Sequence, residues 1–99
     1  MKSLFTVRKR KHTKHPQVIV GANKTRFDSM TITHSTGKAK NRNKKLIKNP
    51  NPNDRRDAYV SKRVISDFKF NFSKAFKNYH LDERDVAELI RFLKEKIKK

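Results

Sequence analysis

The chain has 99 residues, including 27 Lys or Arg and nine Asp or Glu, and its formal net charge is +18 at pH 7. Its lack of cysteine excludes disulfides, thiolate chemistry and cysteine-based zinc sites, and its four His residues show no metal-ligand spacing. No apolar run approaches the roughly 18 residues that span a bilayer, and the N-terminal residues lack the apolar core of a signal peptide. We therefore expect a single domain over residues 1–99 that is cytoplasmic and binds no membrane, metal or cofactor.

The positive charge is concentrated in the first two thirds of the chain. Residues 1–63 contain 18 basic side chains against three acidic ones, whereas residues 64–99 contain nine against six. Like charges gathered in this way oppose a compact state through self-repulsion, and a nucleic acid is the commonest polyanion that neutralises them. Hydrophobic strand-like runs interrupt the basic stretch, which distinguishes it from a disordered basic tail. The charge therefore predicts contact with nucleic acid.

The first third of the chain predicts three short strands. A basic N-terminal segment, residues 1–14, contains a β-prone stretch at residues 4–7. A β-branched run at residues 17–20, bounded by a proline and a glycine, is typical of a buried strand. Residues 26–33 alternate with a period of two, as strand residues do. The polar residues 21–24 between the last two runs predict a β-hairpin.

A basic loop rich in asparagine and proline is predicted at residues 35–54. Pro50 and Pro52 lack backbone donors and push the residues before them out of the helical region, so we expect no regular element to cross this part of the loop. Beyond the loop, residues 58–65 are again strand-like.

An aromatic stripe follows the last predicted strand. Phe68, Phe70 and Phe72 alternate with polar residues. Phe72, Phe76 and Tyr79 then repeat at helical spacing. Such a stripe is more often part of a core, and we expect it to be so here. The alternative is a platform on which the bases of a single-stranded nucleic acid stack.

The most regular predicted element is a C-terminal helix over residues 82–98. Its apolar residues recur at a spacing that places them on one helix face. These residues are Val86, Leu89, Ile90, Leu93 and Ile97. Together with the strands, this amphipathic helix predicts an α+β fold, mainly β, in which the helix packs on a small β-core.

The acidic residues are not interpreted as a catalytic cluster. Asp82 is expected to cap the C-terminal helix, and Glu83 and Asp85 place negative charge in its first turn. Asp54 and Asp57, beside two arginines, are expected to form surface ion pairs that contribute little to stability.

Three parts of the sequence carry a resemblance to a known family: residues 15–20 (His-Pro-Gln-Val-Ile-Val), residues 30–35 (Met-Thr-Ile-Thr-His-Ser), and residues 58–67 followed by residues 80–83 (His-Leu-Asp-Glu) and the terminal helix. Their order and spacing resemble the PemK/MazF toxin family, small SH3-like barrels whose members are typically sequence-selective endoribonucleases. The resemblance implies a small SH3-like or PemK-like barrel and metal-independent cleavage of single-stranded RNA. It also implies an acidic antitoxin as partner and a homodimer.

The candidate catalytic residues are His15, Thr33 and His34. By the resemblance, Thr33 matches the active-site threonine of the family, and His15 occupies the position of an active-site arginine. Cleavage of RNA without a metal needs a base for the 2′-hydroxyl proton and an acid for the leaving oxygen. Imidazole titrates near neutral pH and can serve as either. The alternative is that His15 and His34 are polar strand-end residues that contact phosphate or water.

The candidate nucleic-acid-binding residues are basic side chains of the N-terminal segment, the hairpin, the loop and the two positions after it. They are Arg8, Lys9, Arg10, Lys11, Lys14, Arg26, Lys38, Lys40, Arg42, Lys44, Lys45, Arg55 and Arg56. Among them, Arg8, Arg10, Lys14 and Arg26 are candidates to stabilise charge on a reacting phosphate.

Three functions remain open at the level of the sequence. The first is a PemK/MazF-like ribonuclease toxin restrained by an acidic antitoxin. The second is a non-catalytic module that binds RNA or DNA on the same barrel, such as an accessory protein of a mobile element or a ribosome-associated protein. The third is an inhibitor or adaptor that grips an acidic partner. We take the first as the working hypothesis.

Overall fold

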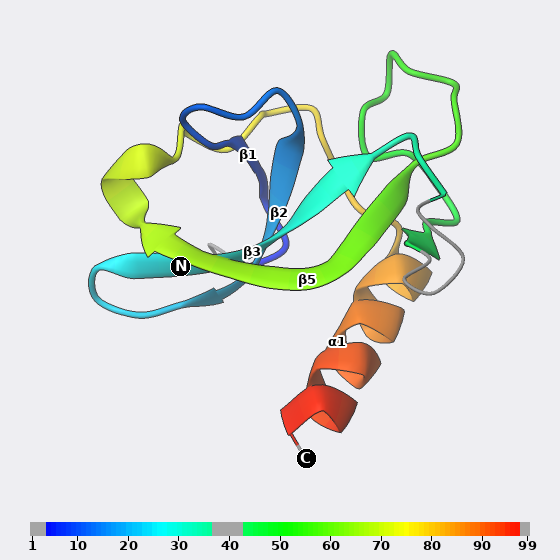
Figure 1. The fold of residues 1–99 in the computed structure, drawn as a ribbon. Coiled ribbons are helices and arrows are strands. Elements are labelled where there is room, and N and C mark those ends of the chain that lie inside the picture. Colours follow the sequence, from blue (N-terminus) through cyan, green and yellow to red (C-terminus); the bar gives the residue numbers. More distant parts are fainter. Residues whose placement is uncertain (1–3, 37–42, 98–99) are drawn as a thin grey trace.

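A bent, five-stranded antiparallel sheet forms the body of the protein in the computed structural model, which describes residues 4–36 and 43–97 (Figure 1). Its order is β1-β2-β3-β5-β4, and each neighbouring pair is antiparallel. The strands are β1 (Val7–Lys9), β2 (Pro16–Ala22), β3 (Arg26–Thr33), β4 (Lys44–Lys45) and β5 (Tyr59–Phe68). A 3-10 turn, η2 (Lys69–Asn71), and one C-terminal helix, α1 (Glu83–Ile97), complete the fold. The predicted α+β class, mainly β, is confirmed.

The sheet does not close into the predicted barrel. Its two edge strands, β1 and β4, are not paired with each other in the described residues, and β4 has two residues, too few to continue the sheet around. The segment after η2 covers the outer edge of β1 instead. The backbone N–H of Phe76 donates to the carbonyl of Val7 (2.9 Å), and that of Ser73 donates to the carbonyl of Lys9 (2.8 Å). An irregular segment thus seals an edge that barrel closure would have sealed.

The main hydrophobic cluster joins the sheet to α1 and to the segment that precedes the helix, from which Phe76, Tyr79 and Leu81 pack against it. Val18, Met30, Ile32 and Val60 are at most 6 % exposed, and they belong to the same buried cluster as Leu89 of the helix. Each such side chain contributes about 1.5–3 kcal/mol when it leaves water. Of the stripe predicted for the helix, Leu89 is fully buried in this cluster, whereas Ile90 is 38 % exposed; Phe92, outside the predicted stripe, packs against the cluster. No helix in residues 4–36 and 43–97 has the length and apolar character needed to cross a membrane.

A polar network is buried between the neighbouring strands β2 and β3. Gln17 is 1 % exposed and Ser29 is fully buried. The Ser29 hydroxyl donates to Gln17 Oε1 (3.1 Å), and Gln17 Nε2 donates to Thr31 Oγ1 (3.0 Å). Because a buried amide without partners is costly, this network favours the observed register, in which Gln17 lies opposite Thr31.

The strand boundaries agree with the predicted ones where periodicity is strong and differ at the ends. The strand at residues 26–33 is β3 as predicted. The first strand begins at Val7 and not at residue 4, because Phe5 adopts a left-handed conformation (φ 62°) that interrupts the extended chain. β5 runs on to Phe68 because it pairs with β3 as far as Arg26.

Within the described residues of the predicted loop at 35–54, there is one strand, β4. Lys44 pairs with Val60 and Lys45 with Tyr59, so that β4 adds a short edge to β5. The bounds of α1 agree with the predicted helix, and Asp82 caps it by accepting a hydrogen bond from the backbone N–H of Arg84 (2.9 Å).

The carboxylate of Asp85 connects α1 to the chain that follows β4. Asp85 is 2 % exposed, and it accepts hydrogen bonds from the backbone N–H groups of Ile47 (2.8 Å to Oδ1) and Lys48 (3.2 Å to Oδ2). Its role is therefore larger than the placement of charge in the first turn of the helix. It sets where residues 49–56 begin to cross the molecule.

Replacing Asp85 with alanine is expected to destabilise the protein by about 2–4 kcal/mol, because two backbone donors lose a charged acceptor in a poorly solvated place. The midpoint of urea unfolding measures this. Glu83→Ala, in the same turn but exposed, is the control and is expected to cost less than about 1 kcal/mol. Equal losses for the two variants would contradict the role of Asp85.

A second carboxylate, Asp67, joins the end of β5 to η2 and to the strand edge at β1. Its Oδ1 accepts from Asn71 Nδ2 (2.9 Å) and from the backbone N–H of Phe68 (2.8 Å), and its Oδ2 accepts from Arg10 Nε (2.8 Å). These hydrogen bonds, that from Asn71 foremost, lower the pKa of Asp67 from 3.8 to about 2. The Arg84 guanidinium likewise lowers the pKa of Asp82 to about 2.

The stability of the protein is expected to fall between pH 4 and pH 2. A carboxyl group whose pKa is lower in the folded than in the unfolded state contributes stability above its unfolded value. That contribution is lost as the pH drops through the folded value. For Asp67 this window runs from 3.8 down to about 2. Urea unfolding across this range is expected to show a shallower acid loss for Asp67→Asn than for the wild type. Asp57→Asn, which removes an exposed carboxylate, is expected to leave the slope unchanged, and equal slopes for all three proteins would contradict the argument.

Candidate active site

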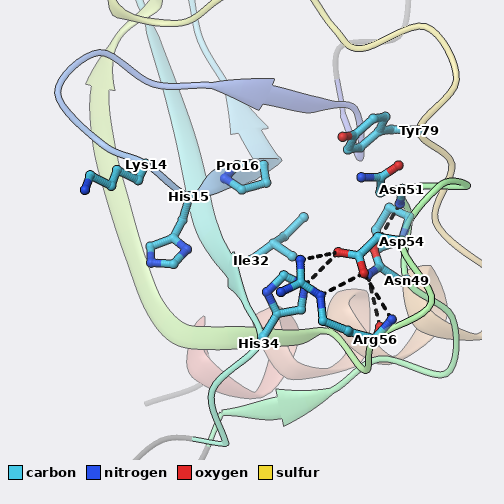
Figure 2. A pocket seen from close by; sticks show the side chains of 11 residues that line it. Lys14, His15, Pro16, Ile32, His34, Asn49, Asn51, Asp54, Arg56 and Tyr79 are labelled. Atoms are coloured by element: carbon cyan, nitrogen blue, oxygen red, sulfur yellow. Dashed lines mark hydrogen bonds and ion pairs between the residues drawn. The ribbon is translucent and has the colours of Figure 1, made fainter.

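A pocket of about 250 Å³ lies at the end of the sheet where β2 begins and β3 ends (Figure 2). Because the two strands are antiparallel, the first residues of one and the last residues of the other meet at the same edge. Residues 14–16 and 32–34 therefore lie together there, and residues 49–56 complete the wall. The lining consists of Lys14, His15, Pro16, Ile32, His34, Asn49, Pro50, Asn51, Asp54, Arg56 and Tyr79.

His34 and Asp54 are in direct contact within this pocket. His34 Nε2 lies 2.8 Å from Asp54 Oδ2, and the two side chains are 41 % and 15 % exposed. Arg56 holds the same carboxylate through Nε to Oδ1 (3.0 Å) and Nη2 to Oδ2 (3.2 Å). The carboxylate thus contacts both an imidazole and a guanidinium, and Figure 2 shows the three side chains gathered together.

The ionisation of Asp54 follows from these contacts. The hydrogen bonds from Arg56, and to a smaller extent that from His34, hold the pKa of the Asp54 carboxyl well below its usual range. Asp54 is therefore ionised at neutral pH. A fixed negative charge at the imidazole orients the ring and stabilises the imidazolium that forms when the ring accepts a proton.

The Asn/Pro-rich sequence explains how Asp54 reaches its place. Asn49 Oδ1 accepts from the backbone N–H of Asn51 (3.0 Å), and Asn51 Oδ1 accepts from that of Asn53 (2.9 Å). The same pattern recurs when Asp54 Oδ1 accepts from the backbone N–H of Arg56 (3.0 Å). Each is a short-range turn of the kind that Asn and Asp favour, and the two prolines restrict the chain between them. Asn49 Nδ2 also donates to the carbonyl of Arg56 (3.1 Å), which closes the segment on itself.

His15 lines the same pocket from the start of β2. In Figure 2, Lys14 and His15 lie on one side, Asp54 and Arg56 lie on the other, and Ile32 lies between them. The backbone carbonyl of His15 accepts from the hydroxyl of Thr13 (3.2 Å). Its exposed imidazole has no hydrogen-bond partner among the described residues, so both ring nitrogens are available to a ligand.

Thr33, the third candidate catalytic residue, does not line the pocket. Side chains alternate along a strand, so that Ile32 and His34 share one side and Thr33 points to the other. Its hydroxyl accepts from the backbone N–H of Ser35 (3.2 Å), which shapes the turn after β3. The structure thus brings together two of the three candidates and adds Asp54 and Arg56. The sequence predicted a surface ion pair for Asp54 and a nucleic-acid contact for Arg56, and it did not predict the contact with His34, because nothing local shows that residue 54 lies against residue 34.

Many of the candidate nucleic-acid-binding cations are engaged within the protein. Arg10 pairs with Asp67 (2.8 Å), Lys44 with Glu88 (3.2 Å) and Lys45 with Asp57 (3.5 Å). Two more lie over aromatic rings: the guanidinium of Arg8 is 4.9 Å from the ring centre of Phe27, and that of Arg26 is 4.1 Å from that of Phe68. These cations also serve the fold.

Four of the candidate cations remain exposed without an acidic partner in the described part of the chain: Lys9, Lys11, Lys14 and Arg55. The three lysines lie on or beside the connection between β1 and β2, and Lys14 lines the pocket. Lys38, Lys40 and Arg42 lie outside the described residues. Within residues 4–36 and 43–97, no group of three His, Cys, Asp or Glu side chains is placed to hold a metal ion.

Comparison of the chain with protein-family models, with curated proteins and with solved structures finds no match.

Proposed function

We propose that the protein is a metal-independent endoribonuclease that cleaves single-stranded RNA in the pocket between His15 and His34. One observation carries the proposal: an imidazole, His34, lies 2.8 Å from the ionised carboxylate of Asp54 in a pocket that a second imidazole also lines. Two imidazoles are the groups that acid–base cleavage of RNA requires near neutral pH.

The contact with Asp54 supports the roles proposed for the two histidines. When His34 is neutral and carries its proton on Nε2, this N–H donates to Asp54 and leaves Nδ1 able to accept a proton. His34 is then the base that takes the proton of the 2′-hydroxyl. The 2′-oxygen bonds to the adjacent phosphorus as the bond from phosphorus to the 5′-oxygen breaks. Protonated His15 gives its proton to the leaving 5′-oxygen, so that the products are a 2′,3′-cyclic phosphate and a 5′-hydroxyl.

Cations at the pocket stabilise the negative charge that develops on the phosphate. Lys14 is exposed at its rim, and Arg56 keeps its Nη1 free of Asp54 while its other nitrogens bind the carboxylate. Donors held in place before the reaction contribute to catalysis, because they need not reorganise as charge develops.

The resemblance to PemK/MazF toxins extends this proposal. It adds a cytoplasmic toxin role, an acidic antitoxin segment that covers the basic pocket, and a homodimer. A non-catalytic RNA-binding module is the second candidate, and one observation favours it: the ring of His15 has no partner among the described residues to orient it as an acid.

Purified protein is expected to cleave single-stranded RNA in the presence of EDTA, and His34→Ala is expected to slow the reaction by at least about 100-fold, the usual contribution of a general base. Asp54→Asn is expected to lower the rate through His34. His80→Ala is the matched control, because His80 is exposed outside the pocket, and it is expected to cleave at the wild-type rate. Gel separation of a labelled RNA measures all four proteins.

The variant Thr33→Ala distinguishes the catalytic residues proposed from the pocket from those implied by the resemblance. The pocket predicts near wild-type cleavage for this variant, whereas the resemblance predicts loss. RNA binding without products would overturn the enzyme and support the binding module. Neither binding nor cleavage at low salt would overturn both and leave a protein that grips an acidic partner.

A further inference from the structure

Two exposed phenylalanines form a stacked pair where β5 ends. Phe70 is 72 % exposed and Phe68 is 40 % exposed, and Phe70 is the most exposed of the large hydrophobic side chains in the described residues. The ring centres are 5.2 Å apart and the ring planes differ by 8°. The guanidinium of Arg26 lies 4.1 Å from the centre of the Phe68 ring. This arrangement differs from the core position predicted for the aromatic stripe, which Phe76 and Tyr79 do occupy.

The pair is held in place by a well-bonded turn. Asp67 binds the backbone N–H of Phe68 and the side chains of Asn71 and Arg10. The backbone N–H of Lys69 donates to the carbonyl of Thr25 (2.8 Å), which fastens η2 to the β2–β3 hairpin. Phe70 therefore projects from a braced turn, and its exposure is a property of the fold.

Positive charge surrounds the exposed ring. Lys9, Lys11 and His12 line a groove of about 390 Å³ together with Phe70 and the residues after it. Lys9 and Lys11 are exposed and have no acidic partner in the described chain. An aromatic face beside unpaired lysines matches a base and its phosphates, whereas an apolar peptide would leave the lysines without a counter-charge. The charge thus selects a single-stranded nucleic acid as the occupant.

The groove is adjacent in the chain to the proposed active site. Lys11 and His12 lie at the groove, while Lys14 and His15 lie at the pocket. Three residues of extended chain span at most about 11 Å, so the Cα atoms of His12 and His15 are no farther apart. The hydroxyl of Thr13 donates to the carbonyls of Arg10 (3.1 Å) and His15 (3.2 Å), which braces the connection.

We propose that Phe70 is a stacking platform for an unpaired base of single-stranded RNA, and that the strand follows Lys11 and Lys14 along the β1–β2 connection to the pocket. This inference rests on the proposed function, because it takes RNA as the nucleic acid that binds. It adds a second subsite and the requirement that the bound bases be unpaired.

Binding is tested with a fluorescently labelled 2′-O-methyl oligouridine, which cannot be cleaved because its 2′-oxygens carry no proton. Phe70→Ala is expected to weaken binding by about 5- to 100-fold, the range for loss of one stacked base. Phe70→Trp, which keeps a flat ring, is expected to bind at least as tightly as the wild type. Ile47→Ala removes another exposed apolar side chain (55 % exposed) and is expected to bind as the wild type does.

Two further measurements separate stacking from charge. The same oligonucleotide annealed to its complement is expected to bind the wild type and Phe70→Ala equally, because paired bases cannot stack on Phe70. Phe70→Ala is expected to keep the salt dependence of the wild type, whereas Lys11→Ala reduces it.

The outcomes for the platform and for the proposed function are distinct. Wild-type affinity of Phe70→Ala for the single strand, or an equal loss for the duplex, overturns the platform even if His34→Ala abolishes cleavage. Weakened single-strand binding by Phe70→Ala in a protein that cleaves no RNA supports the platform and overturns the enzyme. A wild type that fails to bind the single strand at low salt overturns both.

Discussion

The buried carboxylate of Asp85 is the contact on which the proposed site depends. It joins the first turn of α1 to the backbone of Ile47 and Lys48, and the helix is anchored in turn by Leu89 in the core. Residues 49–56 leave from this point, and their short-range Asn and Asp turns carry Asp54 to the edge of the sheet. The carboxylate of Asp54, which contacts His34, thus lies in a segment that begins at a helix some thirty residues later in the chain.

The pocket is built from two kinds of structure: the ends of paired strands and an irregular loop. Antiparallel pairing of β2 with β3 brings His15 and His34 to one edge of the sheet, and the loop supplies Asp54 and Arg56. The basic side chains of the protein fall into two groups. Several arginines and lysines pair with acidic groups or lie over aromatic rings of the protein, whereas the lysines of the β1–β2 connection are exposed and have no acidic partner in the described residues. A net charge of +18 is compatible with a compact fold here because some of the cations pair with acidic side chains at or near the surface, and the unpaired ones face solvent.

The elements that could be predicted from the sequence are those whose signals are local. Alternation over residues 26–33 and the capped, amphipathic pattern of α1 are local signals, and the bounds of both elements were predicted within a residue or two. Two other features have no periodic signal, because they depend on partners far along the chain. One is the covering of the β1 edge by Ser73 and Phe76, and the other is the position of β4. The same is true of the site. His15 and His34 were predicted because both follow from strand ends and imidazole chemistry, whereas the contact of Asp54 with His34 and the exposure of Phe70 are tertiary facts.

The end groups of the RNA products test the central claim most directly. Mass spectrometry of a defined single-stranded RNA, incubated with the protein in EDTA, distinguishes the possible chemistries. Transfer of protons by two histidines predicts a 2′,3′-cyclic phosphate on one product and a 5′-hydroxyl on the other. Intact RNA under conditions where the protein binds it, or products with a 5′-phosphate, would contradict the account.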